Sequence, residues 1–449
     1  MQQFTFIALL SLLHIFGLQA QDVLDQYIRE GVNNNSGLKQ ASLEFESSLE
    51  QLNEARGGLL PSIDFSSRYT KAHGGRSFVV PIGDLMNPVY STLNSLTGED
   101  RFSQIENSTL NFNRTTDIDN KITLTQPIFD KRLILARAIA EDQSKIKHMD
   151  VAIRKRALVA EIKKAYFNYL KSEKLMDLFT STRKLVEENL RSGQALYNND
   201  KVTVDVVLKA KTEIGKLDLQ IAEAEKMRNN SRAYFNYLLN RSLESVIAVE
   251  EVNSTPALPS GISPTSTQRE EFSQIDMGLK ANDSERKLHE SITLPNLYAV
   301  VDYGFQGSEY EFNNRSDYVL ASVVLSWNLF SGFQNKARIQ QTAINSRILE
   351  SREQELAKSI ELEAIQSFYD LKEKKQNFET TSTIVEEAAT TYQLVNKKYQ
   401  EGMSSQLELI DARTNLTNAK IQQIISKYDT WISFAAYERT IASYPIESL

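Results

Sequence analysis

The stretch VLSWNLFSGFQNKARIQ, residues 324–340, passes from one pattern of apolar residues to another without an intervening run of turn residues. Up to Leu329, apolar and polar residues alternate, which is typical of a half-buried strand. From Phe333 onward, the spacing is typical of the first turns of a helix. The stretch therefore predicts a strand joined directly to a helix, with Ser331 and Gly332 permitting the bend.

The same joint occurs a second time because the chain contains an internal repeat. The stretch ITLTQPIFDKRLILARAIAE (122–141) aligns with VVLSWNLFSGFQNKARIQQT (323–342). Further along, LYNNDKVTVDVVLKAK (196–211) aligns with KYQEGMSSQLELIDAR (398–413). The two members of each aligned pair lie about two hundred residues apart, which indicates that one unit was duplicated.

Each copy of the unit is expected to contain two strands and two long helices. Alternation with a period of two predicts strands at about residues 62–70, 119–129, 297–306 and 317–330. Long runs without proline predict helices at about residues 131–199, 203–240, 333–401 and 405–440. The strands are about as long as the ~9–11 residues that cross a bilayer as a tilted strand. The helices have apolar residues at coiled-coil spacing and charged residues elsewhere, so we expect them to pack side by side in a bundle or tube.

The repeat also sets the predicted domain boundaries. The first repeat is expected at residues 21–240 and the second at 263–449, with a proline-containing linker at 241–262. A loop rich in Gly, Ser, Asn and Thr at 71–118 is expected to join the first strand pair, and 307–316 is its shorter counterpart.

Residues 1–20 have the features of a signal peptide. An apolar core from Phe4 to Phe16 precedes Ala20, a small residue suited to cleavage, although no Lys or Arg precedes the core. A buried N-terminal helix is the alternative interpretation. We expect cleavage after Ala20.

Composition limits the classes of protein to which the chain can belong. The 449 residues are 24% charged and 41% hydrophobic, with a formal net charge of −7, so the composition is not that of a disordered chain or of a nucleic-acid-binding protein. The absence of cysteine excludes disulfides, thiolate metal sites and a lipid-bearing N-terminal cysteine. The four histidines are scattered, and no HExxH, GxSxG or Gly-rich phosphate-binding motif occurs. We therefore expect no enzyme, no metal site and no cofactor.

Four strands are too few to close a barrel in a membrane. Membrane barrels start at about eight strands, and open edges would leave backbone N–H and C=O groups unpaired in lipid. Several chains would therefore have to share one barrel, and the long helices would extend it as a shared tube in water. The predicted fold class is an α+β membrane protein in which a shared β-barrel, with four strands per chain, continues into a long α-helical coiled-coil barrel.

Three motifs, taken in order within the duplicated frame, resemble those of the TolC-like outer-membrane efflux proteins. They are LLPSIDFSS (59–67), W-x-L-F-x-G (327–332) and KYQEGMSSQLELIDAR (398–413). The resemblance covers roughly residues 22–440. It implies a homotrimer with twelve strands (three chains of four) in the outer membrane of a Gram-negative bacterium, extended by a helical tunnel in the periplasm. It also implies a periplasmic adaptor protein and an inner-membrane transporter as partners, besides outer-membrane lipid.

The turn between the last two long helices is the first candidate site. Gly402 can adopt the left-handed conformation that ends a helix, and Ser405 can cap the next helix in a capping box with Glu408. Residues Gly402, Met403, Ser404 and Ser405 form the hairpin tip, which the resemblance implies as the contact for the adaptor.

A periplasmic entrance is the second candidate site, and it is implied by the resemblance. Glu408 and Asp411 share one helical face, and they match acidic residues that ring the narrow entrance of the family's tunnel. Tyr399 matches a tyrosine of the gating network, and Asp205 is the corresponding acid of the first repeat, with an offset of one residue. Ser404 stands where relatives carry an arginine, which argues against a salt-bridged lock at that point. A merely solvated helical face is the alternative interpretation of Glu408 and Asp411.

The joint between barrel and tunnel is the third candidate site. Its predicted residues are Pro127, Trp327, Phe330 and Gly332. Trp327 and Tyr318, near opposite ends of the last strand, are also candidates for aromatic anchors at the two membrane interfaces, with ordinary strand packing as the alternative.

These expectations favour a passive exit duct of a tripartite efflux pump or a type I secretion system. The alternative is a periplasmic or surface coiled-coil scaffold, which would have no need for four strands of membrane-spanning length. The substrate and the particular pump leave no trace in the sequence.

Overall fold

The structure is a computed structural model that describes residues 22–252, 254–261, 269–447 and 449. The signal peptide predicted at residues 1–20 lies outside these residues. The chain forms two compact units. The sheet unit comprises residues 51–140 and 283–343, and the helical unit comprises the described parts of 1–50, 141–282 and 344–449.

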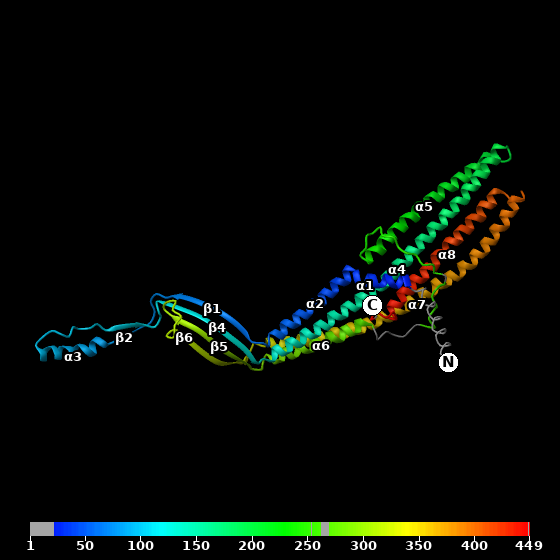
Figure 1. The fold of residues 1–449 in the computed structure, drawn as a ribbon. Coiled ribbons are helices and arrows are strands. Elements are labelled where there is room, and N and C mark those ends of the chain that lie inside the picture. Colours follow the sequence, from blue (N-terminus) through cyan, green and yellow to red (C-terminus); the bar gives the residue numbers. More distant parts are fainter. Residues whose placement is uncertain (1–21, 253, 262–268, 448) are drawn as a thin grey trace, which may run out of the picture. The chain divides into compact units, whose positions relative to one another are not determined.

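The sheet unit contains one four-stranded antiparallel sheet, in which the strand order is β1-β4-β5-β6 (Figure 1). The strands are β1 (Ser62–Lys71), β4 (Thr116–Phe129), β5 (Asn296–Gly307) and β6 (Asp317–Ser326). The first repeat supplies β1 and β4, and the second supplies β5 and β6. Both outer strands, β1 and β6, therefore leave one edge open within the chain.

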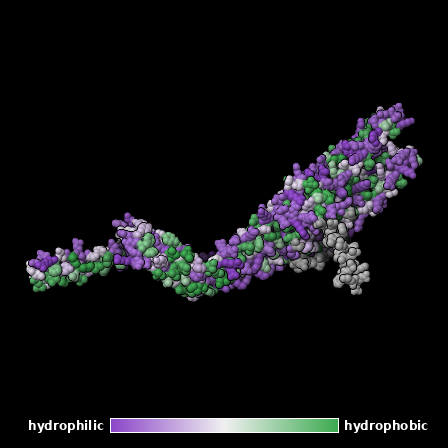
Figure 2. All heavy atoms as spheres, in the orientation of Figure 1, coloured by the Kyte–Doolittle hydropathy of each residue, from purple (hydrophilic) through white to green (hydrophobic). Residues whose placement is uncertain are grey.

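The two faces of the sheet differ in polarity, because the strands alternate with a period of two and are in register. Phe65, Ile122, Tyr303 and Val319 are paired in one row across all four strands. Each of these four side chains is at least 46% exposed. The neighbouring row, on the other face, contains Ser66, Lys121, Gly304 and Tyr318. Apolar residues gather on the visible surface of the sheet region in Figure 2.

The strand predicted at 317–330 is shorter than expected, because β6 ends at Ser326. The last pair of the β5–β6 ladder is Asn296 with Ser326, and β5 begins at Asn296. Residues beyond Ser326 therefore have no neighbouring strand to which they could hydrogen-bond. Trp327 instead donates from its indole nitrogen to the carbonyl of Thr293, at 2.9 Å.

The segment 71–118 is not the simple loop that the sequence predicted. It contains β2 (Ser77–Val80), α3 (Ile82–Thr97) and β3 (Ser108–Asn111), and β2 and β3 form a separate two-stranded ladder. Its Gly, Ser, Asn and Thr residues suggested a loop, but side-chain bonds to a returning segment support the helix, as described below.

Besides α3, the described part of the chain contains seven helices, of which α4 and α7 are the longest. They are α1 (Asp22–Asn34), α2 (Ser36–Gly57), α4 (Lys131–Asn198), α5 (Val204–Leu238), α6 (Glu270–Ser291), α7 (Gln334–Gln400) and α8 (Gln406–Thr440). In the part of the chain that the structure describes, none of the helices is apolar enough over a membrane's thickness to span one.

The core of the helical unit is aromatic. Tyr27 of α1, Tyr166 of α4 and Phe235 of α5 form one cluster, in which the rings of Tyr27 and Phe235 meet edge to face at 5.1 Å. The segment after α5 covers this cluster: the backbone N–H of Ala248 donates to the Tyr27 hydroxyl at 2.7 Å, and that of Glu250 to the Tyr166 hydroxyl at 3.1 Å. The described part of the predicted linker thus packs against the helices.

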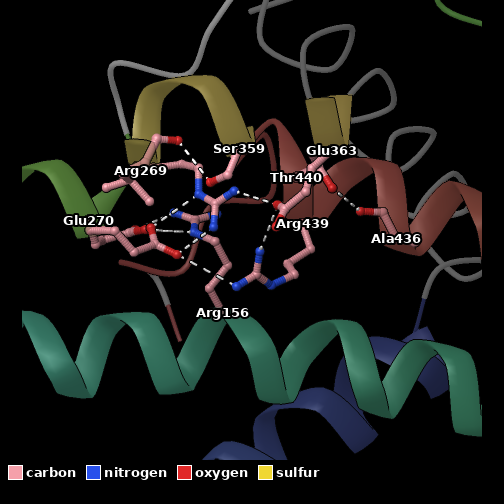
Figure 3. A network of polar contacts seen from close by, with 10 residues as sticks. Arg156, Arg269, Glu270, Ser359, Glu363, Ala436, Arg439 and Thr440 are labelled. Carbon is pink, nitrogen blue, oxygen red and sulfur yellow. Dashed lines mark hydrogen bonds and ion pairs between the residues drawn. The ribbon is translucent and has the colours of Figure 1, made fainter. Parts of the chain in front are cut away.

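An ion-pair network joins four helices of the same unit (Figure 3). Arg156 of α4 pairs with Glu270 at the start of α6, and its Nη1 donates to the carbonyl of Tyr444 at 2.8 Å. Arg269, which precedes α6 and is 4% exposed, pairs through Nη1 with Glu363 of α7 at 2.9 Å. Arg439 of α8 also approaches Glu363. These contacts fix the start of α6 against the end of α8.

Candidate functional site

The turn between α7 and α8 has the conformation that its sequence predicts. Gly402 has a φ of 72°, in the left-handed region that ends helices. The Ser405 hydroxyl accepts from the Glu408 N–H at 3.2 Å, and the Ser405 N–H donates to the Glu408 carboxylate at 3.1 Å. The expected capping box is therefore present.

Glu408 has a second role at this tip, because its carboxylate also accepts a hydrogen bond from the Ser404 hydroxyl. The Ser404 hydroxyl and the Ser405 N–H hold the pKa of Glu408 below its ordinary value. Ser404, which stands where the resemblance suggested an arginine, therefore helps to keep a negative charge at the tip. Asp411, one turn further along α8, is exposed.

The turn between α4 and α5 is built differently. Asp200 takes the left-handed conformation there with a φ of 53°, without the help of a glycine. Asp205, in the first turn of α5, accepts hydrogen bonds from the Thr203 hydroxyl and from Lys209 Nζ, the latter at 3.3 Å. These two donors lower the pKa of Asp205. Thr203 makes no side-chain capping bond, so this tip lacks the capping box of its counterpart.

The two hairpins of the chain contact each other near their tips. Gln406 Nε2 donates to the carbonyl of Val206 at 3.3 Å, and Arg413 of α8 forms an ion pair with Glu213 of α5. A cavity of about 470 Å³ lies between the hairpins. Its lining includes Asp205, Lys209, Glu213, Leu407 and Ile410.

The structure brings only part of the predicted entrance together within one chain. Asp205 lies in the cavity between the hairpins, whereas Tyr399, Glu408 and Asp411 are not among the described residues that line it. The Glu408 carboxylate is held by Ser404 and Ser405 at its own tip, and Asp411 is exposed on α8.

The Arg413–Glu213 pair was not predicted from the sequence. The Arg413 side chain is 4% exposed and that of Glu213 is 17% exposed, so the pair is largely removed from water. A signal was present, since Arg413 follows the buried Leu409 by four residues and therefore shares its helical face. A charged residue at such a position needs a partner, but the sequence does not identify which one.

The joint between β4 and α4 is built around Asp130, whose side chain is 3% exposed. Its carboxylate accepts hydrogen bonds from the backbone N–H and guanidinium of Arg132, at 2.6–2.9 Å, and from the Tyr298 hydroxyl at 2.6 Å. The bonds to Arg132 lower the pKa of Asp130 to about 2, and burial opposes them. The pairing of β1 with β4 stops at Thr125, before Pro127, which has no N–H to donate.

The joint between β6 and α7 differs from this. Gly332 and Phe333 both adopt the left-handed backbone conformation, with φ of 61° and 63°. Because Phe333 is left-handed, α7 begins at Gln334 and not at Phe333, where the sequence predicted its start. The rings of Phe330 and Phe333 meet edge to face at 5.4 Å, and both are more than 70% exposed.

A family of proteins described as "Outer membrane efflux protein" matches the chain over residues 28–241 and 262–439. The chain belongs to the outer membrane efflux protein family. This efflux protein is a component of the outer membrane of a Gram-negative bacterium, with a helical extension in the periplasm, and it is an exit duct and not an enzyme. The scaffold alternative is therefore discarded.

Known proteins resemble this efflux protein over most of its length. Outer membrane protein TolC of Escherichia coli (strain K12) is 19% identical over 438 residues, which are 92% of this chain and 81% of TolC. The CmeC outer membrane channel of Campylobacter jejuni has a TM-score of 0.74 at 16% identity, covering 95% of this chain and 88% of CmeC. The open state of the MtrE outer membrane channel of Neisseria gonorrhoeae has a TM-score of 0.71 at 15% identity, covering 93% of this chain and 88% of MtrE. These likenesses show that the efflux protein has the TolC-like fold.

Proposed function

We propose that this efflux protein works as a homotrimer whose three sheets close one barrel in the outer membrane. The barrel continues as a helical tunnel that receives cargo from a periplasmic adaptor protein and an inner-membrane transporter, in a tripartite efflux pump or a type I secretion system. The observation that carries this proposal is the sheet of four strands, which has two open edges and an exposed apolar face.

The open edges argue for the trimer. Within one chain, β1 and β6 each have a neighbour on one side only. In lipid, the unpaired N–H and C=O groups on the other side would each cost several kcal/mol, about as much as any buried backbone group without a partner. Pairing of β1 with β6 of the next copy removes every edge, and three copies of four strands exceed the minimum of about eight.

The two faces of the sheet argue for the membrane. The row that contains Phe65 and Val319 would face lipid, and the row that contains Ser66 and Lys121 would face the lumen. Lys121 already has a partner on the lumen side, because its Nζ lies 3.3 Å from a carboxylate oxygen of Asp302. Asp302 also accepts a hydrogen bond from the Thr123 hydroxyl at 2.5 Å.

The periplasmic entrance is assigned to Asp205, Tyr399, Glu408 and Asp411. Hydrogen bonds lower the pKa of Asp205 and of Glu408, and Asp411 is exposed on the same helical face as Glu408. Around a threefold axis, three copies of these carboxylates would attract cations and repel anions. The tip residues Gly402 to Ser405 are assigned to the adaptor, and Met403, which is 66% exposed, offers it an apolar contact.

The domain boundaries follow the same scheme. Each repeat, 21–240 and 263–449, would contribute one strand pair and one helical hairpin to the trimer. The linker at 241–262 would lie on the outside of the tunnel, where it covers the aromatic core.

Extraction and conductance test this proposal. We expect the protein to require detergent for release from envelopes, to be trimeric in that detergent and to form cation-preferring pores in planar bilayers. Release by high salt alone would contradict the membrane barrel. A purified trimer that conducts neither as wild type nor as the Glu408→Ala/Asp411→Ala variant would contradict the gated duct.

A further inference from the structure

The structured segment between β1 and β4 has no part in the function proposed above. It leaves the sheet at the end where Lys71 pairs with Thr116. The helices α2 and α4 join the sheet at its other end, where Ser62 pairs with Thr125. Because the helical extension is periplasmic, the segment lies at the cell-exterior end of the strands.

One face of α3 is bound to the chain that returns toward β3. The side-chain amide of Asn87 donates to and accepts from the backbone of Ile105 at 3.0 and 2.9 Å. Two turns further along the same face, Asn94 makes the same pair of bonds with the backbone of Phe102 at 2.9 and 3.0 Å. At Gly83, an added Cβ would lie 2.4 Å from the carbonyl oxygen of Ile105, so a larger residue would push this segment away. The face of α3 that contains Gly83, Asn87 and Asn94 is thus covered by the returning segment.

The opposite face of α3 is an exposed apolar stripe. Ile82, Leu85, Val89 and Leu96 lie on it, and they are 41%, 68%, 49% and 78% exposed. With Thr92 they follow the steps of three and four residues that characterise the contact positions of a coiled coil. The stripe lies away from the asparagines because Leu85 and Asn87, two positions apart, point in very different directions around the helix.

The charges of the segment argue against a lipid surface as the occupant of the stripe. Between Ser77 and Gly98 the only charged residue is Asp84, and its carboxylate accepts from the Asn107 side chain at 2.9 Å. Helices that lie on membranes combine an apolar face with Lys and Arg that attract anionic headgroups. An uncharged stripe at coiled-coil spacing instead suits a second stripe of the same kind.

We propose that the α3 stripe packs against the α3 stripes of the other copies, so that three α3 helices form a cap over the outer mouth of the duct. This inference rests on the proposed trimer. Its partner is the same chain because the segment leaves directly from β1, the edge strand that would pair with the next copy. Threefold symmetry places the three segments at equivalent positions on the exterior rim of the barrel, where their stripes can meet around the axis, and cargo leaves when the three helices separate.

Single cysteines test the cap, because the chain contains no cysteine of its own. Val89→Cys lies on the stripe, and Leu85→Cys is a second stripe position in case the first variant does not assemble. Ser91→Cys is the matched control, since Ser91 is exposed on the same helix but lies off the stripe. With one cysteine per chain, oxidation can link copies only in pairs, so we expect a dimer band on denaturing gels for the stripe variants and at least tenfold less of it for Ser91→Cys.

The conductance of the linked trimers is then measured in planar bilayers. Oxidised Val89→Cys should lose most of its conductance and recover it when reductant is added, whereas Ser91→Cys should not change. A trimer that conducts but gives equal linkage at Val89 and Ser91, or none at either stripe position, overturns the cap and leaves the exit duct intact. A protein that proves monomeric in the extraction experiment overturns both.

Discussion

The guanidinium of Arg413 and the carboxylate of Glu213 form a buried ion pair between α8 and α5, the returning helices of the two hairpins. The two residues are two hundred positions apart in the sequence, at equivalent ends of the duplicated unit. Their pairing therefore joins the two repeats close to the proposed entrance.

Removing one partner of this pair should destabilise the helical unit. Arg413→Met leaves the Glu213 carboxylate buried without a partner, so we expect a loss of about 3 kcal/mol. The double variant Arg413→Met/Glu213→Met should recover most of that loss, because it leaves no unpaired charge. Thermal unfolding of the detergent-solubilised protein measures both.

Arg183→Met is the control for this prediction. Arg183 pairs with Asp218 of α5 at 2.7 Å, but that pair is solvent-exposed, and we expect a much smaller change in melting temperature. If Arg183→Met and Arg413→Met lowered the melting temperature equally, the burial of the Arg413–Glu213 pair would not explain its contribution to stability.

The Asp130 carboxylate should make the stability of the sheet unit depend on pH in the acidic range. Its pKa falls from 3.8 to about 2 on folding, so it stabilises the folded state above pH 4, and this contribution disappears as the pH falls through 2. The full contribution is about 2 kcal/mol. Asp130→Asn should therefore have a lower melting temperature than wild type at pH 7, and the difference should shrink below pH 4. Asp276→Asn, which removes an exposed carboxylate paired with Lys280, is the control, and we expect it to change the melting temperature at pH 7 only slightly.

The tip between α7 and α8 allows capping and charge to be separated. Ser405→Ala removes the capping hydroxyl without changing the charge, and we expect a loss of about 1 kcal/mol of local stability. Asp411→Asn removes a charge and no capping bond, so it should reduce the cation preference of the pore while leaving the melting temperature unchanged. Hydrogen exchange of the tip amides and reversal potentials in a salt gradient measure the two effects. If Asp411→Asn leaves the selectivity unchanged, the carboxylate does not face the conduction path.

Two adjacent residues of β6 test which face of the sheet meets lipid. Val323 shares the face of Val319, and it is 68% exposed, whereas Ser322 points to the other face. Arginine on the lipid side of a membrane barrel costs about 2–4 kcal/mol at mid-depth. Val323→Arg should therefore reduce the amount of folded protein in the outer membrane, and Ser322→Arg should assemble normally and change the conductance. The reverse pattern would exchange the lumen and lipid faces.

Much of the fold is predictable because it depends on local patterns. Period-two alternation located the strands, and the order Ser405, Gln406, Leu407, Glu408 is sufficient to predict a capping box. The duplicated motifs then identified the family. For the strands and the capping box, the information lies within a few residues of the feature that it determines.

The features that the sequence did not reveal depend on distant partners. The sequence shows that Arg413 is a charged residue on a buried helical face, but its partner depends on how the two hairpins align. Nothing in the sequence around Glu213 distinguishes it from the other acidic residues of α5. The helix α3 was missed because Gly83, Pro88, Asn87 and Asn94 are typical of loops. Its asparagines support a helix only because they bind the returning backbone, and that pairing exists only once the segment has folded.

The unequal lengths of the two exterior connections have a consequence for how such ducts diversify. The first repeat connects its strands through the segment that contains α3, whereas the second connects β5 and β6 through a short turn between Gly307 and Asp317. An insertion at this end changes no strand register and no hairpin tip. The outward-facing connections can therefore acquire new sequence in evolution, one repeat at a time, while the inward-facing tips stay fitted to the machinery that loads them.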